Sequence, residues 1–555
     1  MPVSKYNKEY LLKCLGFKIS EEELARNIDN MGLNIEAADK ETLTLEFQAN
    51  RPDLVSTVGL ARALRYFMRR SRNFKYKVKP PGADDVINVG SHVEKIRPYI
   101  AALIVRKMKL SEEQLRDIIN FTERVSENYG RHREKIAMGI HELKGVKPPF
   151  FYDAYEDEEF VPLNKNKPMK YSSIVKTEEK GKKYGALGAA ERKYVALKDT
   201  KGTMSLIPVL NSNRTRVSKD TESMLVDVTG RSREVIEKIV DMLAADFIDM
   251  GFEVSQVSIS YAGKKVTLPK MESREYQIPL SQMNAEIGVS VGFNNVILLA
   301  NKMGYEAALL GRNIMFHTPP YRLDIINEQD IIEDVAVAYG YDYIQPIALP
   351  ATQQGSFNEI SKLFDRMSRV MVGLGFSEAM NSYLTNEEIN FKKMRLVPQK
   401  DHVTIENPKA ETISMLRTWL LPSLMRNLGM SMHDKLPIRI FELDMCFGVR
   451  DGVPEETHHL AGVACHSQAN FNEVKAVVEG LSKKMGIKLS MAKGEHPGFI
   501  EGRCAQILLD KKNIGFLGEL HPEVLTSFGI EEPVVGFEMD LDAVGSEGSE
   551  TDKSR

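Results

Sequence analysis

The stretch TPPYRLDIINEQDIIEDVAVAYGYDYI, from Thr318 to Ile344, places four carboxylates close together in the chain. Asp330, Glu333 and Asp334 stand at positions i, i+3 and i+4, a spacing that brings side chains onto one face of a helix. Asp324 comes shortly before them, at the end of a strand that we expect to follow the double proline. Because three acids on one helical turn repel each other, the pattern predicts a positive charge among them.

Two interpretations account for this acidic stretch. In the first, the four acids bind Mg²⁺, a hard cation that prefers carboxylate oxygens and keeps several of its waters. In the second, they form a solvated first turn that complements the positive N-terminal end of the helix dipole. The spacing alone is compatible with both interpretations.

The bulk composition is that of a folded protein with several domains. At 555 residues the chain exceeds the size of a single hydrophobic core. Hydrophobic residues make up 43% of it and charged residues 27%, as in ordinary globular proteins. The formal net charge of −3 excludes a polycationic nucleic-acid coat, so any contact with RNA must come from local basic patches.

Cysteine usage and the N-terminal sequence favour a reducing compartment. The four cysteines are widely separated and form no CxxC pair, which argues against a disulfide scaffold and against structural zinc. The N-terminus lacks the apolar core of a signal peptide, and no apolar run is long enough to span a membrane. We therefore expect a cytoplasmic protein without membrane contact.

Helix and strand patterns divide the chain into four segments and a tail, and they predict a multidomain α+β protein. Residues 1–85 form a small α/β unit ending in a basic linker, and residues 90–265 form a larger α/β domain. Residues 270–346 carry the acidic stretch on a helix-helix-wing pattern, and residues 350–545 contain strands of an antiparallel sheet with helices. The Gly/Ser-rich residues 546–555 are predicted to be disordered.

A run of basic side chains interleaved with aromatic ones begins at the end of the first segment. This composition is suited to phosphate contacts and base stacking. It is also typical of a solvated basic helix face that leads into a Pro-Pro linker, and we favour this second interpretation. The residues concerned are Arg65, Tyr66, Phe67, Arg69, Arg70, Arg72, Phe74, Lys75, Tyr76, Lys77 and Lys79.

A polar cluster in the second segment is the strongest candidate for a catalytic pocket. NSNRTRVSKDTESMLVDVTG supplies amides, hydroxyls, a guanidinium and a carboxylate around the ends of two predicted strands. Such groups can hold a ribose and an ester, while Asp227 or Thr229 orients a water molecule. Ordinary Asx and Ser/Thr turns are the alternative explanation. The polar residues are Asn211, Asn213, Arg214, Thr215, Asp227 and Thr229.

Other motifs are absent or unremarkable. The chain contains no GxxxxGK[ST] loop, GxGxxG, GxSxG elbow or HExxH. The adjacent His458 and His459 are predicted to lie in a surface turn, because no further ligand stands at helical spacing from them. The segment SEEQLRDIINFTERVSENYG predicts an amphipathic helix whose apolar face carries Leu115, Ile118, Ile119 and Val125.

Several stretches, in the same order, resemble the β subunit of phenylalanyl-tRNA synthetase in its archaeal and eukaryotic form. The acidic stretch is similar to the signature of that family's winged-helix-like domain, and ANRPDLVSTVGLARAL to its N-terminal element. AMGIHELKGVKPP and NSNRTRVSKDTESMLVDVTG resemble its editing domain. NFNEVKAVVEGL, HPGFIEGRCAQILLDKKNIGFLGELHPEVL and FEMDL resemble its catalytic-like domain. The resemblance covers nearly the whole chain.

The resemblance implies a metal site and a division of labour between subunits. It implies that Mg²⁺ is held by Asp324, Asp330, Glu333 and Asp334, and that the C-terminal domain is a degenerate class II synthetase active site. FELDMCFG indeed lacks the arginine that ATP requires, and no GxGxGxR-like third motif follows. ATP and phenylalanine would then bind to a separate α subunit, in a complex of two α and two β subunits that acts on tRNA(Phe).

The resemblance also implies that this chain hydrolyses mischarged Tyr-tRNA(Phe). An apolar pocket rejects the extra hydroxyl of tyrosine only weakly, so a second pocket that binds this hydroxyl can select the error. We assign Asn211, Thr215, Asp227 and Thr229 to that pocket. Two alternatives stay open, namely a free-standing deacylase of mischarged tRNA and a non-catalytic tRNA-binding scaffold.

Overall fold

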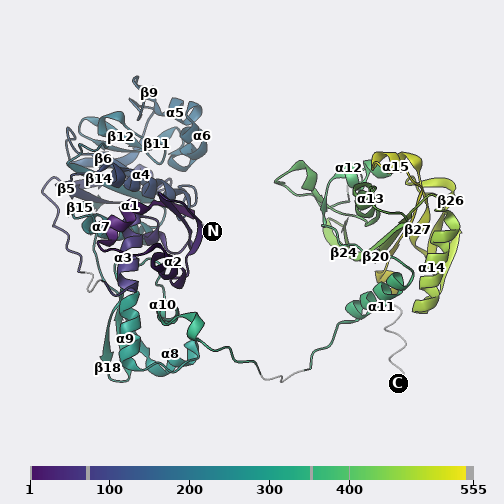
Figure 1. The fold of residues 1–555 in the computed structure, drawn as a ribbon. Coiled ribbons are helices and arrows are strands. Elements are labelled where there is room, and N and C mark those ends of the chain that lie inside the picture. The colour runs from purple at the N-terminus through teal and green to yellow at the C-terminus, as the bar shows by residue number, and fades with distance from the viewer. Residues whose placement is uncertain (1–2, 71–74, 350–353, 399–400, 546–555) are drawn as a thin grey trace. The chain divides into compact units, whose positions relative to one another are not determined.

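The computed structural model describes residues 3–70, 75–349, 354–398 and 401–545, which form two compact units (Figure 1). Residues 1–348 make up the first unit and residues 349–555 the second. The first unit contains an 11-stranded sheet and two 3-stranded sheets, and the second contains a 7-stranded sheet. The protein is therefore a mixed α/β multidomain protein. The domain boundaries predicted inside the first unit stay predictions, and the predicted disordered tail lies outside the described residues.

The N-terminal part of the first unit is a small antiparallel sheet with helices. Its strand order is β1-β3-β2, and Ser20 caps α2 by accepting a hydrogen bond from the Glu23 amide. Tyr66 and Phe67 are buried on α3, so these two aromatic side chains pack inside the protein instead of offering stacking surfaces. Arg72 and Phe74 of the basic run lie outside the described residues. The elements are β1 (Val3–Asn7), α1 (Lys8–Leu15), α2 (Glu21–Asn30), β2 (Asn34–Ala38), β3 (Thr42–Glu46), η1 (Pro52–Leu54) and α3 (Thr57–Phe67).

A buried arginine connects three parts of the first unit. Arg62, on α3, places its Nη1 atom 2.9 Å from Asp246 Oδ1 and 2.9 Å from Asp249 Oδ2, at the end of α7 (Arg233–Asp249). The Arg62 guanidinium also lies 3.9 Å from the centre of the Tyr321 ring. Burial raises the pKa of Asp246 to about 6 even though Arg62 favours its charged form. A buried charge requires such partners, so the three segments are fixed against one another.

The large sheet of the first unit curves until its two ends approach each other. Its strand order is β13-β12-β11-β7-β4-β15-β5-β14-β6, and Asn211 on β13 donates a hydrogen bond of 3.1 Å to the Ile140 carbonyl on β6. In Figure 1, α5 and α6 lie at the same end of this domain as β11 and β12. The strands are β4 (Val86–Val89), β5 (Tyr99–Arg106), β6 (Ile136–Glu142), β7 (Phe150–Tyr155), β10 (Ala189–Ala190), β11 (Lys193–Asp199), β12 (Gly202–Leu206), β13 (Leu210–Asn211), β14 (Ser223–Gly230), β15 (Glu253–Tyr261) and β16 (Lys264–Leu268).

The helices around the large sheet include the predicted amphipathic helix. A capping box between Ser111 and Gln114 starts α4 (Glu112–Glu127). Ile118 and Val125 are buried as expected, whereas Ile119 is 42% exposed, because successive residues point about 100° apart on a helix. Ile119 therefore lies at the exposed edge of the apolar face. The remaining helices are η2 (Ser91–Val93), α5 (Tyr171–Thr177), α6 (Glu179–Tyr184), η3 (Gly185–Gly188) and η4 (Asn213–Thr215), beside the short pair β8 (Glu159–Phe160) and β9 (Met169–Lys170).

Residues 270–346 contain a three-stranded sheet and three helices. The strand predicted to lead into Asp324 is wrong, since residues 318–327 form turns, one of them closed by the Arg322 amide and the Pro319 carbonyl. Two consecutive prolines supply no N–H groups for a sheet ladder, which explains the turn. The elements are β17 (Glu275–Pro279), α8 (Leu280–Ile287), α9 (Phe293–Lys302), β18 (Glu306–Leu310), β19 (Asn313–His317), α10 (Glu328–Tyr339) and η5 (Tyr341–Tyr343).

The second unit is built on a long antiparallel sheet with the order β20-β23-β24-β28-β27-β26-β25, in which only the β20–β23 pair is parallel. The hairpin of β23 and β24 turns at Asp451 and Gly452, so His458 and His459 lie inside β24 and not in a turn, contrary to the prediction. The strands are β20 (Ser377–Glu378), β21 (Leu384–Thr385), β22 (Met415–Leu416), β23 (Ile438–Arg450), β24 (Val453–Cys465), β25 (Leu489–Lys493), β26 (Phe499–Leu509), β27 (Lys512–Leu520) and β28 (Val534–Asp540).

The helices of the second unit cover both faces of this sheet with two separate apolar clusters. One cluster packs α11 and α14 against the sheet, and the other packs α13. Among the described residues of the whole chain, no helix has the length and apolar character needed to cross a bilayer. The helices are α11 (Glu359–Gly373), α12 (Glu387–Asn390), η6 (Lys392–Met394), η7 (Glu411–Ile413), α13 (Leu421–Met430), α14 (Phe471–Met485), α15 (Pro522–Ser527) and α16 (Asp542–Gly545).

Candidate active site

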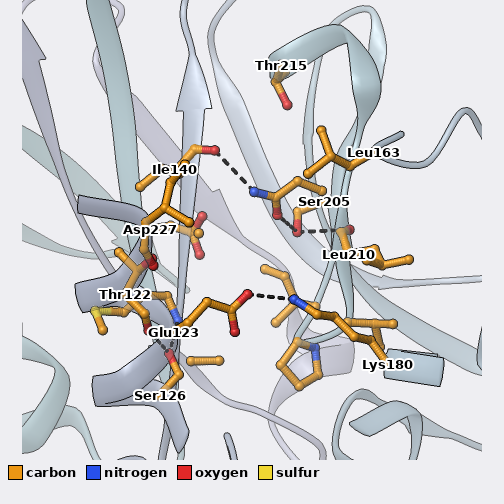
Figure 2. A pocket seen from close by; sticks show the side chains of 18 of the residues that line it. Thr122, Glu123, Ser126, Ile140, Leu163, Lys180, Ser205, Leu210, Thr215 and Asp227 are labelled. Atoms are coloured by element: carbon orange, nitrogen blue, oxygen red, sulfur yellow. Dashed lines mark hydrogen bonds and ion pairs between the residues drawn. The ribbon is translucent and has the colours of Figure 1, made fainter. Parts of the chain in front are cut away.

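A cavity of about 410 Å³ lies where the two ends of the large sheet meet (Figure 2). Its volume is within the range of sites that bind small molecules. Side chains from α4, β6, α6, the β12–β13 turn, η4 and β14 form its walls. All four residues assigned to a pocket from the sequence, Asn211, Thr215, Asp227 and Thr229, line this cavity.

Asp227 is held in place by a buried histidine that the sequence analysis did not single out. His141 is fully buried, and its Nε2 atom lies 2.9 Å from Asp227 Oδ1. On its other side, Nδ1 lies 3.1 Å from the hydroxyl oxygen of Thr215. His141 therefore bridges two of the predicted pocket residues.

The contact with Asp227 makes Nε2 of His141 a hydrogen-bond donor. A carboxylate is only an acceptor, so Nε2–H donates to Asp227. In the neutral imidazole Nδ1 is then an acceptor, and the Thr215 hydroxyl donates to it. A threonine hydroxyl, an imidazole and a carboxylate thus form one directed hydrogen-bond chain that ends at the cavity wall.

A glycine makes room for this contact. Gly139 on β6 is the cross-strand partner of Asp227 on β14. A methyl group at position 139 would lie 2.4 Å from Asp227 Oδ1 and 3.0 Å from His141 Nε2. These distances are shorter than carbon–oxygen and carbon–nitrogen contact distances, so the absence of a side chain at Gly139 permits the pairing of Asp227 with His141.

Two of the predicted residues use their polar groups to build the wall. The Asn211 amide donates to the Ile140 carbonyl, and its oxygen accepts a hydrogen bond of 2.9 Å from Ser205 (Figure 2). The Thr229 hydroxyl accepts a hydrogen bond of 3.0 Å from Nε of the buried Arg97. Burial lowers the pKa of Arg97 to about 10. Thr229 is consequently less suited than Asp227 to orient a water molecule.

Charged side chains across the cavity neutralise one another. Glu123 on α4 accepts hydrogen bonds of 2.6 Å from Lys180 on α6 and 2.5 Å from Arg133, and Figure 2 shows the contact with Lys180. Burial works against the charged form of Glu123, but these two cations outweigh it and lower its pKa. Arg133 is further fixed by the Pro208 carbonyl at 2.9 Å and by the Tyr184 ring, 4.4 Å below its guanidinium. This part of the wall is therefore electrostatically satisfied.

The acidic cluster contains its own positive charge. Arg322 lies between two of the acids, with Nη2 at 2.6 Å from Asp324 Oδ2 and 2.6 Å from Asp334 Oδ2. Tyr305 donates a further hydrogen bond to Asp334. Burial opposes ionisation of Asp324, but Arg322 outweighs it and lowers the pKa of Asp324 to about 2. The predicted cation among the acids is thus present as a side chain.

The other two acids of the cluster, Asp330 and Glu333, differ in their contacts. Asp330 forms a capping box with Asn327, and its carboxylate accepts hydrogen bonds of 2.9 Å from the Asn327 amide and 2.6 Å from the Ile326 amide. Glu333 is exposed. Carboxylate oxygens are the donors that Mg²⁺ prefers, so the chemistry of the set suits this cation. The geometry of the cluster suits Mg²⁺ less well than its chemistry does. Arg322 already binds Asp324 and Asp334, and the backbone amides of Ile326 and Asn327 already bind Asp330.

A group of potential metal ligands occurs in the second unit. Cys446, His459 and Glu538 each offer an atom within 4.8 Å of the others, the one such group of three found among the described residues. Glu538, however, accepts hydrogen bonds from the amides of Leu420 and Leu421 at the start of α13, and a 2.7 Å contact from His459 Nδ1. The group serves as a buried cap for α13.

Comparisons with known proteins identify the family of the chain. Residues 346–541 match the model described as the phenylalanyl tRNA synthetase beta chain CLM domain, and residues 276–341 match the tRNA synthetase B5 domain. These matches define the chain as a component of an aminoacyl-tRNA synthetase. The phenylalanine–tRNA ligase beta subunit of Methanococcoides burtonii is 31% identical over 94% of this chain and 97% of its own length. That of Methanocaldococcus jannaschii is 32% identical over 98% of this chain and 100% of its own.

A solved structure is similar as well. The N-terminal fragment of the phenylalanyl-tRNA synthetase beta subunit from Pyrococcus horikoshii aligns with a TM-score of 0.59 and 29% identity, covering 61% of this chain and 100% of the fragment. The chain belongs to the phenylalanine–tRNA ligase β subunit family.

Proposed function

We propose that this chain is the β subunit of a cytoplasmic phenylalanine–tRNA ligase and that it acts together with an α subunit on tRNA(Phe). The observation that supports this proposal most strongly is the similarity to such β subunits over nearly the full length of both chains. ATP and phenylalanine bind on the α subunit, in a complex of two α and two β subunits. In this proposal the second unit is a class II synthetase fold without ATP chemistry, and residues 270–346 are a winged-helix-like domain at the subunit interface.

Two arginines of the second unit are bound to carboxylates, which supports the assignment of ATP chemistry to the α subunit. Arg417 is fully buried and forms an ion pair of 2.5 Å with Glu442, and Arg439 forms one of 3.0 Å with Glu473. Guanidinium groups bound to carboxylates are not free to stabilise the charge that develops when an adenylate forms.

The proposed activity of the cavity is hydrolysis of Tyr-tRNA(Phe). Asp227 accepts a hydrogen bond from a water molecule and directs its oxygen at the carbonyl carbon of the ester. The water oxygen forms the new bond to carbon, the ester C–O bond breaks, and the proton passes to the leaving ribose hydroxyl. His141 keeps Asp227 in one orientation, and Asn211 and Thr215 shape the wall that meets the tyrosyl group.

The two alternative functions, a free-standing deacylase and a non-catalytic scaffold, each leave a part of the molecule unexplained. A free-standing deacylase would not need the second unit, whose sheet runs through residues 377–540. A non-catalytic scaffold would not need a buried His141–Asp227 pair at a cavity wall, an arrangement that costs desolvation. Both candidates therefore account for less of the molecule.

The metal assignment is part of the proposal. We propose that Asp324, Asp330, Glu333 and Asp334 hold Mg²⁺, the ion whose preferred donors they supply. Glu333 gives the cleaner test, because Asp330 also caps α10 and its removal would destabilise the helix with or without metal. Glu333→Gln should lower the Mg²⁺ content of the purified protein measured by elemental analysis. An unchanged content would mean that Arg322 alone neutralises the cluster.

The first experiment measures Phe-tRNA(Phe) formation with ATP by this chain alone and after co-expression with its candidate α subunit. Activity only with the partner supports a β subunit without an adenylation site. Activity of the chain alone would contradict the assignment of ATP chemistry to the α subunit. If neither sample is active but Tyr-tRNA(Phe) is hydrolysed, the deacylase becomes the better description.

A further inference from the structure

One cation on the cavity wall, Arg216, has no partner among the residues that the structure describes. Five charged side chains line the cavity, namely Glu123, Arg133, Lys180, Arg216 and Asp227. Glu123 pairs with Arg133 and Lys180, and Asp227 accepts a hydrogen bond from His141. Arg216 is exposed, and among the described residues its side chain makes no hydrogen bond or ion pair. Three cations and two carboxylates line the cavity, so its wall carries one net positive charge.

The backbone at this position is held firmly while the side chain is free. Thr215, the preceding residue, is fully buried and bound to His141. Val217, the following residue, packs against the large apolar core of the first unit. Arg216 itself ends the short helix η4, its amide 3.4 Å from the Asn213 carbonyl. A fixed Cα with a free guanidinium is a suitable arrangement for binding an anion that arrives with a ligand.

An apolar shelf extends from the same cavity along α4. A shallow depression of about 230 Å³ is lined by Glu112, Leu115, Arg116, Ile119 and Asn120, and it shares Leu115 and Ile119 with the cavity. Ile119 is 42% exposed, although it lies on an otherwise amphipathic helix. An exposed apolar side chain of this kind offers a face against which a nucleobase can pack.

We propose that the mouth of the cavity binds the nucleotide next to the esterified one, with Arg216 bound to the connecting phosphate and the α4 shelf in contact with its base. This inference rests on the proposed hydrolysis and specifies how the RNA end is held. The cavity then accepts the aminoacyl nucleoside, and the single free cation meets the first phosphate outside it. Contact with phosphate carries no sequence information, so Arg216 positions the strand and does not read it.

The test compares two substrates that differ in phosphate. Arg216→Gln should raise the KM for Tyr-tRNA(Phe) about fivefold, as expected for the loss of one exposed ion pair, with kcat nearly unchanged. With tyrosyl-adenosine, which has no phosphate, the variant and the natural chain should be equal. The slope of log(kcat/KM) against log[salt] should fall by about 0.7, the value for one phosphate on a single strand. Arg216→Lys should restore part of the loss. Arg231→Gln, at an exposed arginine that does not line the cavity, is the matched control.

The outcomes separate this inference from the proposed function. If the natural chain hydrolyses neither substrate, the proposed hydrolysis itself is wrong. If it hydrolyses both, and Arg216→Gln leaves the KM and the salt slope unchanged, Arg216 does not bind phosphate. An equal loss on both substrates would also overturn the inference, because it would mean that Arg216 supports the shape of the cavity. For the shelf, Ile119→Ser should raise the KM for Tyr-tRNA(Phe) but not for tyrosyl-adenosine, and an unchanged KM would remove it from the site.

Discussion

The two units each contain a histidine paired with a carboxylate on a neighbouring antiparallel strand, with opposite consequences. In the first unit, His141 binds Asp227 through one oxygen, and Asp227 lines a cavity. In the second, His459 binds Glu538, whose oxygens are also occupied by the amides that begin α13. The residue types are nearly the same. What differs is whether the carboxylate lines a cavity or caps the start of a helix, and this decides whether the pair can act on a ligand.

The most severe way to test the comparison is to remove the carboxylate that lines the cavity. Asp227→Ala should slow hydrolysis of Tyr-tRNA(Phe) about 100-fold, the effect typical of losing a group that orients the attacking water. Attachment of phenylalanine should be unaffected, because that chemistry is assigned to the α subunit. Deacylation and aminoacylation assays on the α–β complex measure both. Asp220→Ala, at an exposed aspartate outside the cavity, is the control. An unchanged deacylation rate would remove Asp227 from the site.

The corresponding change in the second unit should affect stability and leave hydrolysis intact. Glu538→Gln weakens a buried acceptor of several N–H groups, and we expect a loss of about 2 kcal/mol in the free energy of unfolding. The single tryptophan, Trp419, directly precedes the capped residue Leu420, so its fluorescence follows unfolding of this unit. Glu531→Gln, at an exposed glutamate, is the control. A Tyr-tRNA(Phe) hydrolysis rate that fell together with stability would contradict the distinction between the two pairs.

A smaller change tests the geometry of the cavity pair without removing a polar group. Gly139→Ala introduces a methyl group 2.4 Å from Asp227 Oδ1, which must turn Asp227 or His141 out of its present position. We expect hydrolysis to slow about tenfold, because small displacements of positioning groups are costly. Gly448→Ala, in a strand where nothing lies within 4 Å of the added carbon, is the matched control. If both variants behave like the natural chain, the orientation of Asp227 is unimportant.

The smallest effect concerns pH. Burial opposes the charged form of His459, but the hydrogen bond and charge of Glu538 outweigh it and raise the pKa of His459 above its ordinary value of 6.5. The charged pair therefore stabilises the second unit fully below about pH 6.5, and this contribution is lost as pH rises through the raised pKa. The stability difference between the natural chain and His459→Gln, followed by Trp419 fluorescence, should shrink from pH 6 to pH 9. A difference that grows over this interval would contradict the pairing.

The sequence alone predicts features that depend on residues close together in the chain. Strand patterns in the second unit predict the antiparallel sheet, and four of the six polar residues singled out between positions 211 and 229 line one cavity, whereas Asn213 and Arg214 do not. His141 could not be found in this way, because its role depends on the register that places Gly139 opposite Asp227. The one local signal is a glycine two residues before a histidine, a spacing that puts both side chains on the same face of what the structure shows to be strand β6.

The errors have the same origin. The sequence predicts a turn at His458 and His459 because the length of the β23–β24 hairpin is not visible in the chain. It places Ile119 on an apolar face, but an amphipathic pattern does not reveal which side of a helix borders a cavity. Arg322, two residues before Asp324, supplies the positive charge expected among the acids, and its contact with Asp334 requires the turn at residues 318–327.

The buried Arg62 limits how this protein can be divided. Its partners Asp246, Asp249 and Tyr321 come from distant parts of the chain, so a fragment that starts after α3 would keep two acids without their cation. An unpaired buried charge costs several kcal/mol, a large share of the stability of a typical domain. Folding of the first unit consequently requires α3, the end of α7 and the segment around Tyr321 together.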